Sequence, residues 1–381
     1  EHFEDRSLDA YFDASEEWVK GRNAASYGVE YHCPRYLVDA LLARKYPFSI
    51  RARADGGPGS DDEELAQAGL TMQTRSEDED DAVPEYGAYG TRLETYMTEA
   101  YALGSSLVPF HDGAQTENFL AVYRNGPGVR DVATVFSKLV INDQLQLRAP
   151  TDGYGEQGIV CRERGRKIVV QDRNRALVSY MPKLSYNRDV RSLRTCVFLP
   201  HEKWATGASP FEEVWFGEEE GKPGDGYAGD HARVVCLRDG DVYMGIVPLS
   251  DAGAMSWEDR DGYSILSFYH YRGAPRDFSR RAFSTKGGGF AFVIASSAEY
   301  PSFDAFRKVV MESEATSRYR TNMHYRKNPV RIVNFRCDGD ELKLEYSPAV
   351  QSIRYVSVNG RYQEDPRLEV TGFPLHRLPF N

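Results

Sequence analysis

The sequence lacks the signatures of several large functional classes. No apolar run approaches the roughly 20 residues that a membrane-spanning helix needs, so we expect no membrane insertion. Basic residues number 47 against 57 acidic ones, and the net charge of −10 argues against nucleic acid as the main partner. No glycine-rich loop follows a strand and opens a helix. Gly287–Gly289 lies between strands, which favours a hairpin or bulge over a phosphate-binding loop.

Cysteine is scarce, and its spacing excludes a metal framework. The five cysteines are Cys33, Cys161, Cys196, Cys236 and Cys337. None forms a CxxC pair or has the spacing of zinc ligands, so we predict free, mostly buried thiols and neither a metal nor a cofactor.

Helix signals are few, and one segment is strongly acidic. Apolar residues at helical spacing predict helices over 7–20, 34–45 and 302–314, the last with Ser302 as its N-cap. Residues 55–85 contain GGPGSDDEE and EDEDD but almost no large apolar side chains, so we predict a mobile acidic insertion there. A calcium-binding loop is the alternative, although the segment has no EF-hand spacing.

Strand signals dominate from about residue 93 onward. Asp239-Gly240, Asp338-Gly339 and Asn359-Gly360 each separate two strand-like runs, which is a strong signal for a hairpin. Further strands are expected at 118–123, 133–140, 167–171, 176–181, 193–199, 263–271 and 290–296. This number of strands is too large for one open sheet. We therefore predict an all-β fold: a large antiparallel, multi-sheet β-sandwich with a short helical N-terminal leader and a small C-terminal β-sheet.

The predicted organisation has four parts. Residues 1–54 are expected as the helical leader and 55–85 as the acidic insertion. Residues 86–327 are expected as the main β-sandwich, and 328–381 as the small C-terminal sheet.

The segment 94–124 stands out because polar, titratable and aromatic residues crowd into what otherwise reads as two strands and their connection. A structural strand pair would alternate apolar and polar residues more cleanly. Its candidate functional residues are Tyr96, Tyr101, His111, Gln115, Glu117 and Arg124.

The runs TYMTEAYALGSS at 95–106 and HDGAQTENF at 111–119 carry a resemblance. They resemble the β-sandwich half of toroid-plus-sandwich carbohydrate-active proteins, a group that includes heparinase II/III-like polysaccharide lyases. The resemblance covers roughly 95–123 and implies a supersandwich-like fold, a polysaccharide or oligosaccharide as ligand, and a helical toroid domain upstream.

A lyase acting on uronic-acid polymers needs a base for the C5 proton, an acid for the leaving oxygen, and groups that neutralise the carboxylate. Tyr96, Tyr101 and His111 are the candidates for acid and base. Gln115, Glu117 and Arg124 are the candidates for holding the substrate. Glycoside hydrolysis would instead need two carboxylates, and the spacing of Glu99, Asp112 and Glu117 selects no pair.

Two further places could contact a glycan. Phe268–Arg272 ends in aromatic residues with His270 and Arg272, which suits stacking on sugar rings, and the Arg-rich runs 188–194 and 272–281 could hold an anionic sugar. Ordinary strand packing, a polar turn for the Gly/Asp-rich loop 224–231, and solvated salt bridges are the structural alternatives.

Three functional hypotheses follow. The first is a polysaccharide lyase or glycoside hydrolase, and the second is a non-catalytic β-sandwich that binds glycan or buttresses a separate catalytic domain. The third, a structural protein, is favoured if Tyr96, His111 and Gln115 are buried against backbone partners. The compartment stays open from the sequence, with a secreted or periplasmic location favoured.

Overall fold

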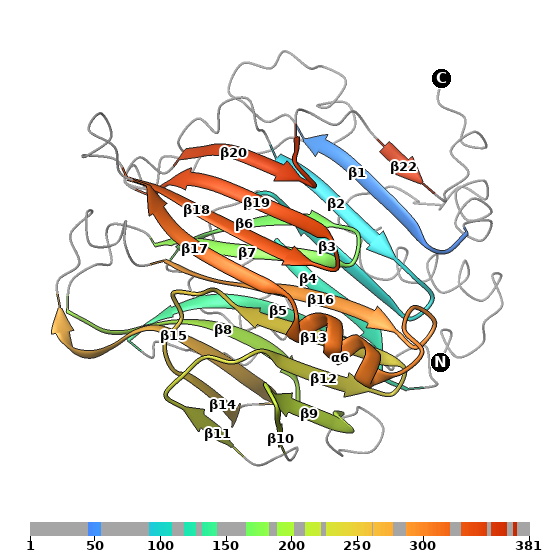
Figure 1. Ribbon diagram of the computed structural model, residues 1–381, viewed down its shortest axis with the longest axis horizontal. Helices are drawn as coiled ribbons and strands as arrows, with labels where there is room; N and C mark the ends of the chain where they lie inside the picture. The colour runs from blue at the N-terminus through green and yellow to red at the C-terminus, as the bar shows by residue number, and fades with distance from the viewer. Residues whose placement is uncertain are drawn as a thin grey trace, which may run out of the picture.

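The strands of this protein are arranged in three antiparallel sheets of ten, seven and five strands in a computed structural model (Figure 1). The structure describes residues 45–54, 91–108, 118–126, 132–142, 165–182, 189–201, 210–221, 226–260, 262–276, 287–320, 329–348, 352–363 and 369–371. The all-β, antiparallel, multi-sheet prediction is confirmed. The helices expected at 7–20 and 34–45 and the acidic insertion lie outside the described residues.

The ten-stranded sheet contains the segment that the sequence singles out. In sheet order its strands are β11 (Tyr227–Gly229), β14 (Met255–Arg260), β15 (Tyr263–Arg276), β8 (Val190–Pro200), β5 (Val132–Ile141), β4 (Phe119–Arg124), β3 (Tyr101–Ser106), β2 (Thr91–Met97), β1 (Phe48–Ala54) and β22 (Glu369–Thr371). The strand β1 pairs with β2, although the sequence places residues 48–54 in the helical leader.

The seven-stranded sheet is the middle layer. In sheet order its strands are β10 (Glu219–Gly221), β9 (Glu213–Phe216), β12 (Val235–Asp239), β13 (Val242–Pro248), β16 (Gly288–Ser296), β7 (Arg175–Pro182) and β6 (Gly165–Asp172). In β16, Phe290 and Phe292 belong to the core shared with the ten-stranded sheet, whereas Ala291 and Val293 belong to a second core on the opposite face. Burial on both faces explains why this strand is apolar throughout.

The five-stranded sheet and one helix cover the other face of the middle layer (Figure 1). The sheet contains β17 (Glu314–Arg320), β18 (Val330–Cys337), β19 (Asp340–Ser347), β20 (Ser352–Val358) and β21 (Arg361–Tyr362). The helix α6 (Phe303–Met311) confirms the helix predicted over 302–314. Ser302 is its N-cap, as predicted, since its side chain accepts a hydrogen bond from the backbone of Ala305. The C-terminal sheet therefore begins with β17, before the boundary expected at 328.

The predicted hairpins are confirmed. Asp338 and Gly339 have φ of 51° and 79°, and Asn359 and Gly360 have φ of 51° and 73°. Two positive φ values in succession match the turn whose twist suits a two-residue hairpin, and Asp, Asn and Gly tolerate this conformation best. Asp239 pairs with Val242 across the third hairpin, and Gly240, with φ of 55°, and Asp241 connect β12 to β13.

Strand direction gives the sandwich two opposite ends. The antiparallel registers place the Tyr101 end of β3 beside Tyr123 of β4, and the Ser105 end of β3 beside Phe119. The strand β5 continues toward Ile141 at the Phe119 end, where it meets Leu193 of β8. We call the first the Tyr101 end and the second the Phe119 end.

Within the described residues, no helix has the length and apolar character of a membrane span. The described cysteines Cys196, Cys236 and Cys337 are free and buried, as predicted, and Cys33 and Cys161 lie outside these residues.

Candidate functional site

Tyr101 is a buried structural residue. Its side chain is 3% exposed, and its hydroxyl donates a hydrogen bond of 2.8 Å to Oε1 of Glu299. Burial, together with the neighbouring Glu299 carboxylate, raises the pKa of Tyr101 far above its ordinary value. A raised pKa opposes loss of the phenolic proton, so these surroundings do not favour Tyr101 as a base, and its catalytic role stays a prediction.

Tyr96 lies beside Tyr101 but is only half-buried. The two rings contact each other with centroids 6.2 Å apart. Burial and the Glu299 carboxylate raise the pKa of Tyr96, and the Arg173 guanidinium partly opposes them. Of the two tyrosines, Tyr96 is thus the more accessible, in a setting where its hydroxyl remains a proton donor.

Glu299 and Arg173 lie near Tyr96 and Tyr101, although no sequence pattern associates them with segment 94–124. Glu299 follows β16, and its carboxylate also accepts hydrogen bonds from the backbone and side chain of Ser296. Arg173 lies in the turn between β6 and β7. Both belong to connections of the middle layer, so only the stacking of the two sheets brings them to the Tyr101 end.

Part of the polarity of segment 94–124 has a structural cause. Glu94 is 2% exposed, yet its carboxylate accepts from Arg51 at 3.1 Å and from Arg92 at 3.2 Å. Arg51 also reaches Asp172 of the middle layer at 2.6 Å. This buried ion-pair network joins three strands of the two sheets and accounts for the break in the alternating pattern.

The candidate residues of segment 94–124 are not all close together in the structure. Arg124 is exposed at the Tyr101 end, where its backbone N–H bonds the carbonyl of Ala100. His111, Gln115 and Glu117 lie outside the described residues. The residues that flank them, Val108 and Asn118, lie at the Phe119 end.

His270 faces the protein interior. The imidazole is 5% exposed, and Nε2 lies 2.9 Å from Oγ1 of Thr195. A register shift between Tyr269 and Tyr271 marks a β-bulge at this position. A register irregularity can redirect one side chain of a strand, and His270 packs inward here. This position does not favour the predicted glycan contact, which stays a prediction.

Arg272 is exposed, as a contact residue must be, and it has basic neighbours. The register pairs Arg272 with Ser192 and Arg276 with Val190, which brings the two Arg-rich runs side by side at the Phe119 end. Arg191 lies on β8 within the same paired region, and Arg191, Arg272 and Arg276 are all exposed. We call these three residues the basic strip.

Two tyrosines order the basic strip. The Arg272 guanidinium lies 5.3 Å from the ring centroid of Tyr269, and that of Arg276 lies 5.7 Å from the ring of Tyr271. The Tyr271 hydroxyl in turn donates 2.6 Å to the carbonyl of Ala274, which closes the tip of β15. Such cation–π contacts hold an arginine near one orientation while its N–H groups still reach outward.

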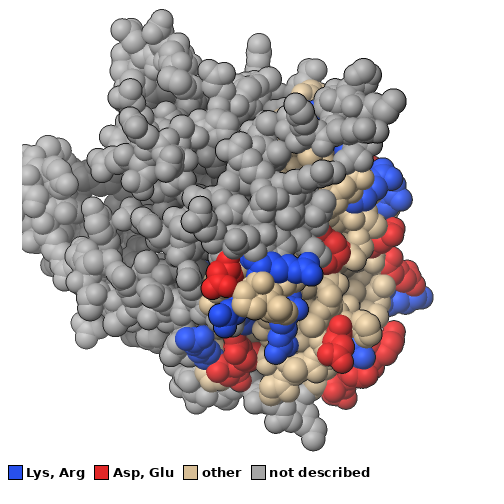
Figure 2. All heavy atoms as spheres, turned by 90° about the vertical axis from the view of Figure 1, so that its left-hand side faces the viewer, with Lys and Arg blue, Asp and Glu red and all other residues tan. Residues whose placement is uncertain are grey.

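The arginines of the basic strip differ from the neighbouring Arg194 in their ion pairing. The neighbouring Arg194 is buried and pairs with Glu258 at 3.2 Å. Within the described part of the chain, no ion pair involves the three residues of the strip. Figure 2 views the side of the molecule toward which β15 projects in Figure 1, and both basic and acidic side chains lie on its described part.

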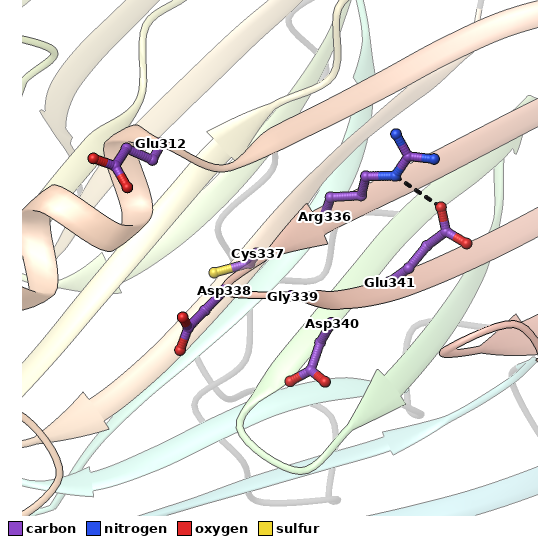
Figure 3. A pocket seen from close by; sticks show the side chains of 7 residues that line it. All are labelled: Glu312, Arg336, Cys337, Asp338, Gly339, Asp340 and Glu341. Atoms are coloured by element: carbon purple, nitrogen blue, oxygen red, sulfur yellow. Dashed lines mark hydrogen bonds and ion pairs between the residues drawn. The ribbon is translucent and has the colours of Figure 1, made fainter.

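An acidic hollow at the β18–β19 turn is a second feature. It has a volume of about 440 Å³ and is lined by Glu312, Arg336, Cys337, Asp338, Gly339, Asp340 and Glu341 (Figure 3). Glu341 accepts from Arg336 at 2.8 Å. Asp340 pairs with Arg173 at 2.9 Å and also with Arg175 of β7. Because arginines pair with these carboxylates, we interpret the hollow as a contact between the five-stranded sheet and the middle layer.

Among the described residues, no group of three or more His, Cys, Asp or Glu side chains could hold a metal ion. His231, in the Gly/Asp-rich loop, is exposed and follows the short edge strand β11. No family model matches the chain, and no curated protein matches it either.

Proposed function

We propose that this chain is a carbohydrate-active protein that binds an acidic polysaccharide along the basic strip. The observation that carries the proposal is the pairing of Arg272 and Arg276 with the Arg191 region of β8. Two arginine runs about eighty residues apart in the sequence thereby lie on paired strands at the Phe119 end of the sheet.

The chemistry of the strip fits a polymer with repeated negative groups. Guanidinium groups bind carboxylate or sulfate oxygens through two parallel hydrogen bonds, which lysine cannot do. The net charge of the protein is −10, so the local positive charge of the strip does not follow from the overall composition. Such a local charge favours anionic ligands. Tyr269 and Tyr271 beside the arginines add aromatic surface for sugar rings.

The resemblance extends the proposal to catalysis by β-elimination. In that reaction a base removes the C5 proton, a C4–C5 double bond forms, and the C4–O bond breaks as an acid protonates the leaving oxygen. His111, Gln115 and Glu117 stay in this proposal because their segment joins β3 to β4 at the end that carries the strip. A supersandwich-like fold paired with a helical toroid belongs to the same proposal.

A non-catalytic role as a glycan-binding or buttressing module is the second candidate. The burial of Tyr101 and His270 favours it, since both side chains are committed to contacts within the sandwich. Glycoside hydrolysis has no comparable support among the described residues, because Glu99 is exposed at a turn while Glu94 and Glu299 are held by hydrogen bonds.

Binding is tested by affinity electrophoresis in gels that contain polygalacturonate, alginate or heparin. We expect retardation by at least one of them, and roughly tenfold weaker binding for the double variant Arg272→Ala/Arg276→Ala, because hydrogen bonds to charged groups are lost. The matched control is Arg318→Ala/Arg336→Ala, which removes the same charge from the five-stranded sheet. Equal losses in both double variants would show that only net charge matters and would refute the strip.

Catalysis is tested with the same polymers by recording the absorbance of unsaturated uronides beside a reducing-end assay. A rise in both indicates a lyase, and reducing ends alone indicate a hydrolase. His111→Ala should abolish elimination while leaving the unfolding transition unchanged. Retained binding without either product selects the non-catalytic module.

A further inference from the structure

A second aromatic surface lies on the five-stranded sheet, away from the basic strip. Tyr355 of β20 and Tyr362 of β21 have ring centroids 5.4 Å apart and an interplanar angle of 34°. Tyr362 is 43% exposed, which is unusual for a large apolar side chain among the described residues. We call these two residues the tyrosine platform.

The platform is fixed in place by backbone structure. The Asn359-Gly360 turn holds β21 against β20, with Ser357 opposite Tyr362. The backbone N–H of Gln363 continues the pairing by bonding the carbonyl of Val356 at 3.0 Å. The Gln363 side chain then accepts a hydrogen bond from Arg92 of the ten-stranded sheet. An exposed ring on an anchored hairpin is preorganised for a ligand, which lowers the entropy lost on binding.

Tyr355 is likewise placed by a local irregularity. A register shift between Glu345 and Tyr346 marks a β-bulge in the pairing of β19 with β20. Nζ of Lys343 lies over the Tyr355 ring, 5.0 Å from its centroid. Bulges that redirect side chains on a sheet surface are common beside binding sites.

Basic and acidic side chains form ion pairs beside the platform. Lys343 pairs with Glu345 at 3.0 Å, and Arg320 reaches the same carboxylate at 3.4 Å. The neighbouring Glu341 pairs with Arg336. The Lys343 ammonium and the Glu345 carboxylate lie side by side, so hydroxyl groups of a ligand could donate to Glu345 and accept from Lys343. Aromatic faces flanked by a donor and an acceptor suit a polyhydroxylated ring with an apolar C–H face.

We infer that the tyrosine platform is a second glycan-binding site, which stacks an uncharged sugar ring on Tyr355 and Tyr362. It extends the proposed glycan binding, but it differs from the basic strip in ligand charge and in sheet. The structural alternative is a cross-strand aromatic pair that only stabilises the hairpin.

The test uses native gels that contain polygalacturonate, its carboxyl-reduced form, a soluble β-glucan or a galactomannan. We expect at least one uncharged polymer to retard the protein, with little change as salt is raised. Tyr362→Ala should weaken this binding about tenfold, in line with the loss of one stacked ring. Tyr362→Phe keeps the ring and should bind nearly as well as the unchanged protein. Val132→Ala, at a large apolar side chain that is also exposed, is the matched control.

The outcomes separate the two sites. Arg272→Ala/Arg276→Ala should leave binding to the uncharged polymers intact. The proposal for the basic strip can therefore be refuted without refuting the platform, and the reverse also holds. Failure of every uncharged polymer to retard the protein would overturn the platform. So would unchanged binding by Tyr362→Ala, or an effect of that variant confined to self-association or to thermal stability.

Discussion

The fully buried Arg331 makes the sharpest prediction about stability. Its side chain has no exposed surface, and Nη2 pairs with Oδ2 of Asp251 at 2.7 Å. Nε donates to Oγ of Ser317 at 2.8 Å, and Nη1 to the hydroxyl of Tyr346 at 3.2 Å. Burial by itself would lower the pKa of Arg331, but nearby Tyr346, Tyr319 and Asp251 outweigh it and raise the pKa, so the guanidinium keeps its charge.

The two partners of this ion pair differ in exposure, so their removal should differ in cost. Asp251→Ala leaves a buried cation without its counter-charge, and we expect a loss of about 3 kcal/mol in the free energy of unfolding. Arg331→Met removes the charge and keeps an apolar side chain of similar length. It leaves Asp251, whose side chain is 26% exposed, within reach of water, so we expect a loss of only about 1–2 kcal/mol.

Urea unfolding followed by tryptophan fluorescence measures both variants and the double variant. The double variant should be about as stable as Arg331→Met alone, which gives a coupling energy of about 3 kcal/mol, equal to the loss expected for Asp251→Ala. Additive losses, or a smaller loss for Asp251→Ala than for Arg331→Met, would refute the claim that the buried pair clamps the five-stranded sheet to the body.

Further predictions concern two glycines, the cysteines and Glu341. Gly287→Ala should destabilise the fold by more than about 2 kcal/mol in the same urea assay, because an added Cβ would lie 1.2 Å from Nη1 of Arg331. Gly240→Ala, at φ of 55° but with open space around it, should cost only about 1 kcal/mol. At most two of the five thiols should react with Ellman's reagent before unfolding, since three are buried and burial raises the pKa of Cys236 to about 12; a third fast thiol would contradict this. Hydrogen bonds from Arg336 and Asn334 lower the pKa of Glu341, so its contribution is present above the ordinary glutamate range and is lost as the pH falls through the lowered pKa. Between about pH 6 and pH 3, Glu341→Gln should therefore lose less stability than the unchanged protein, by a few tenths of a kcal/mol because the pair is exposed, and parallel pH curves would refute it.

Local sequence patterns predicted much of the fold. The Asp-Gly and Asn-Gly pairs marked three hairpins, and Ser302 marked the start of α6, because turns and caps depend on the backbone preferences of a few adjacent residues. The continuous apolar run at 290–296 indicated a strand inside the sandwich. The pattern could not show that this strand faces two different cores.

The candidate site was harder to predict from the sequence than the fold. Tyr101 and His270 carry the residue types of catalysis, and both prove to be buried and hydrogen-bonded. Crowding along the chain suggested one cleft, whereas strand direction separates Tyr96 from the residues that flank His111. Glu299 and Arg173 carried no signal, since each lies in a connection of another sheet.

The sequence by itself determined that this protein is built of antiparallel strands, where several of those strands turn, and that its described cysteines are free. These properties depend on neighbouring residues and on the contrast between apolar and polar side chains. The tertiary structure alone decided that two distant arginine runs form one strip, that Tyr355 and Tyr362 meet, and that Arg331 lies inside. Each depends on strand register and on the stacking of three sheets, which are set by contacts between residues far apart in the chain.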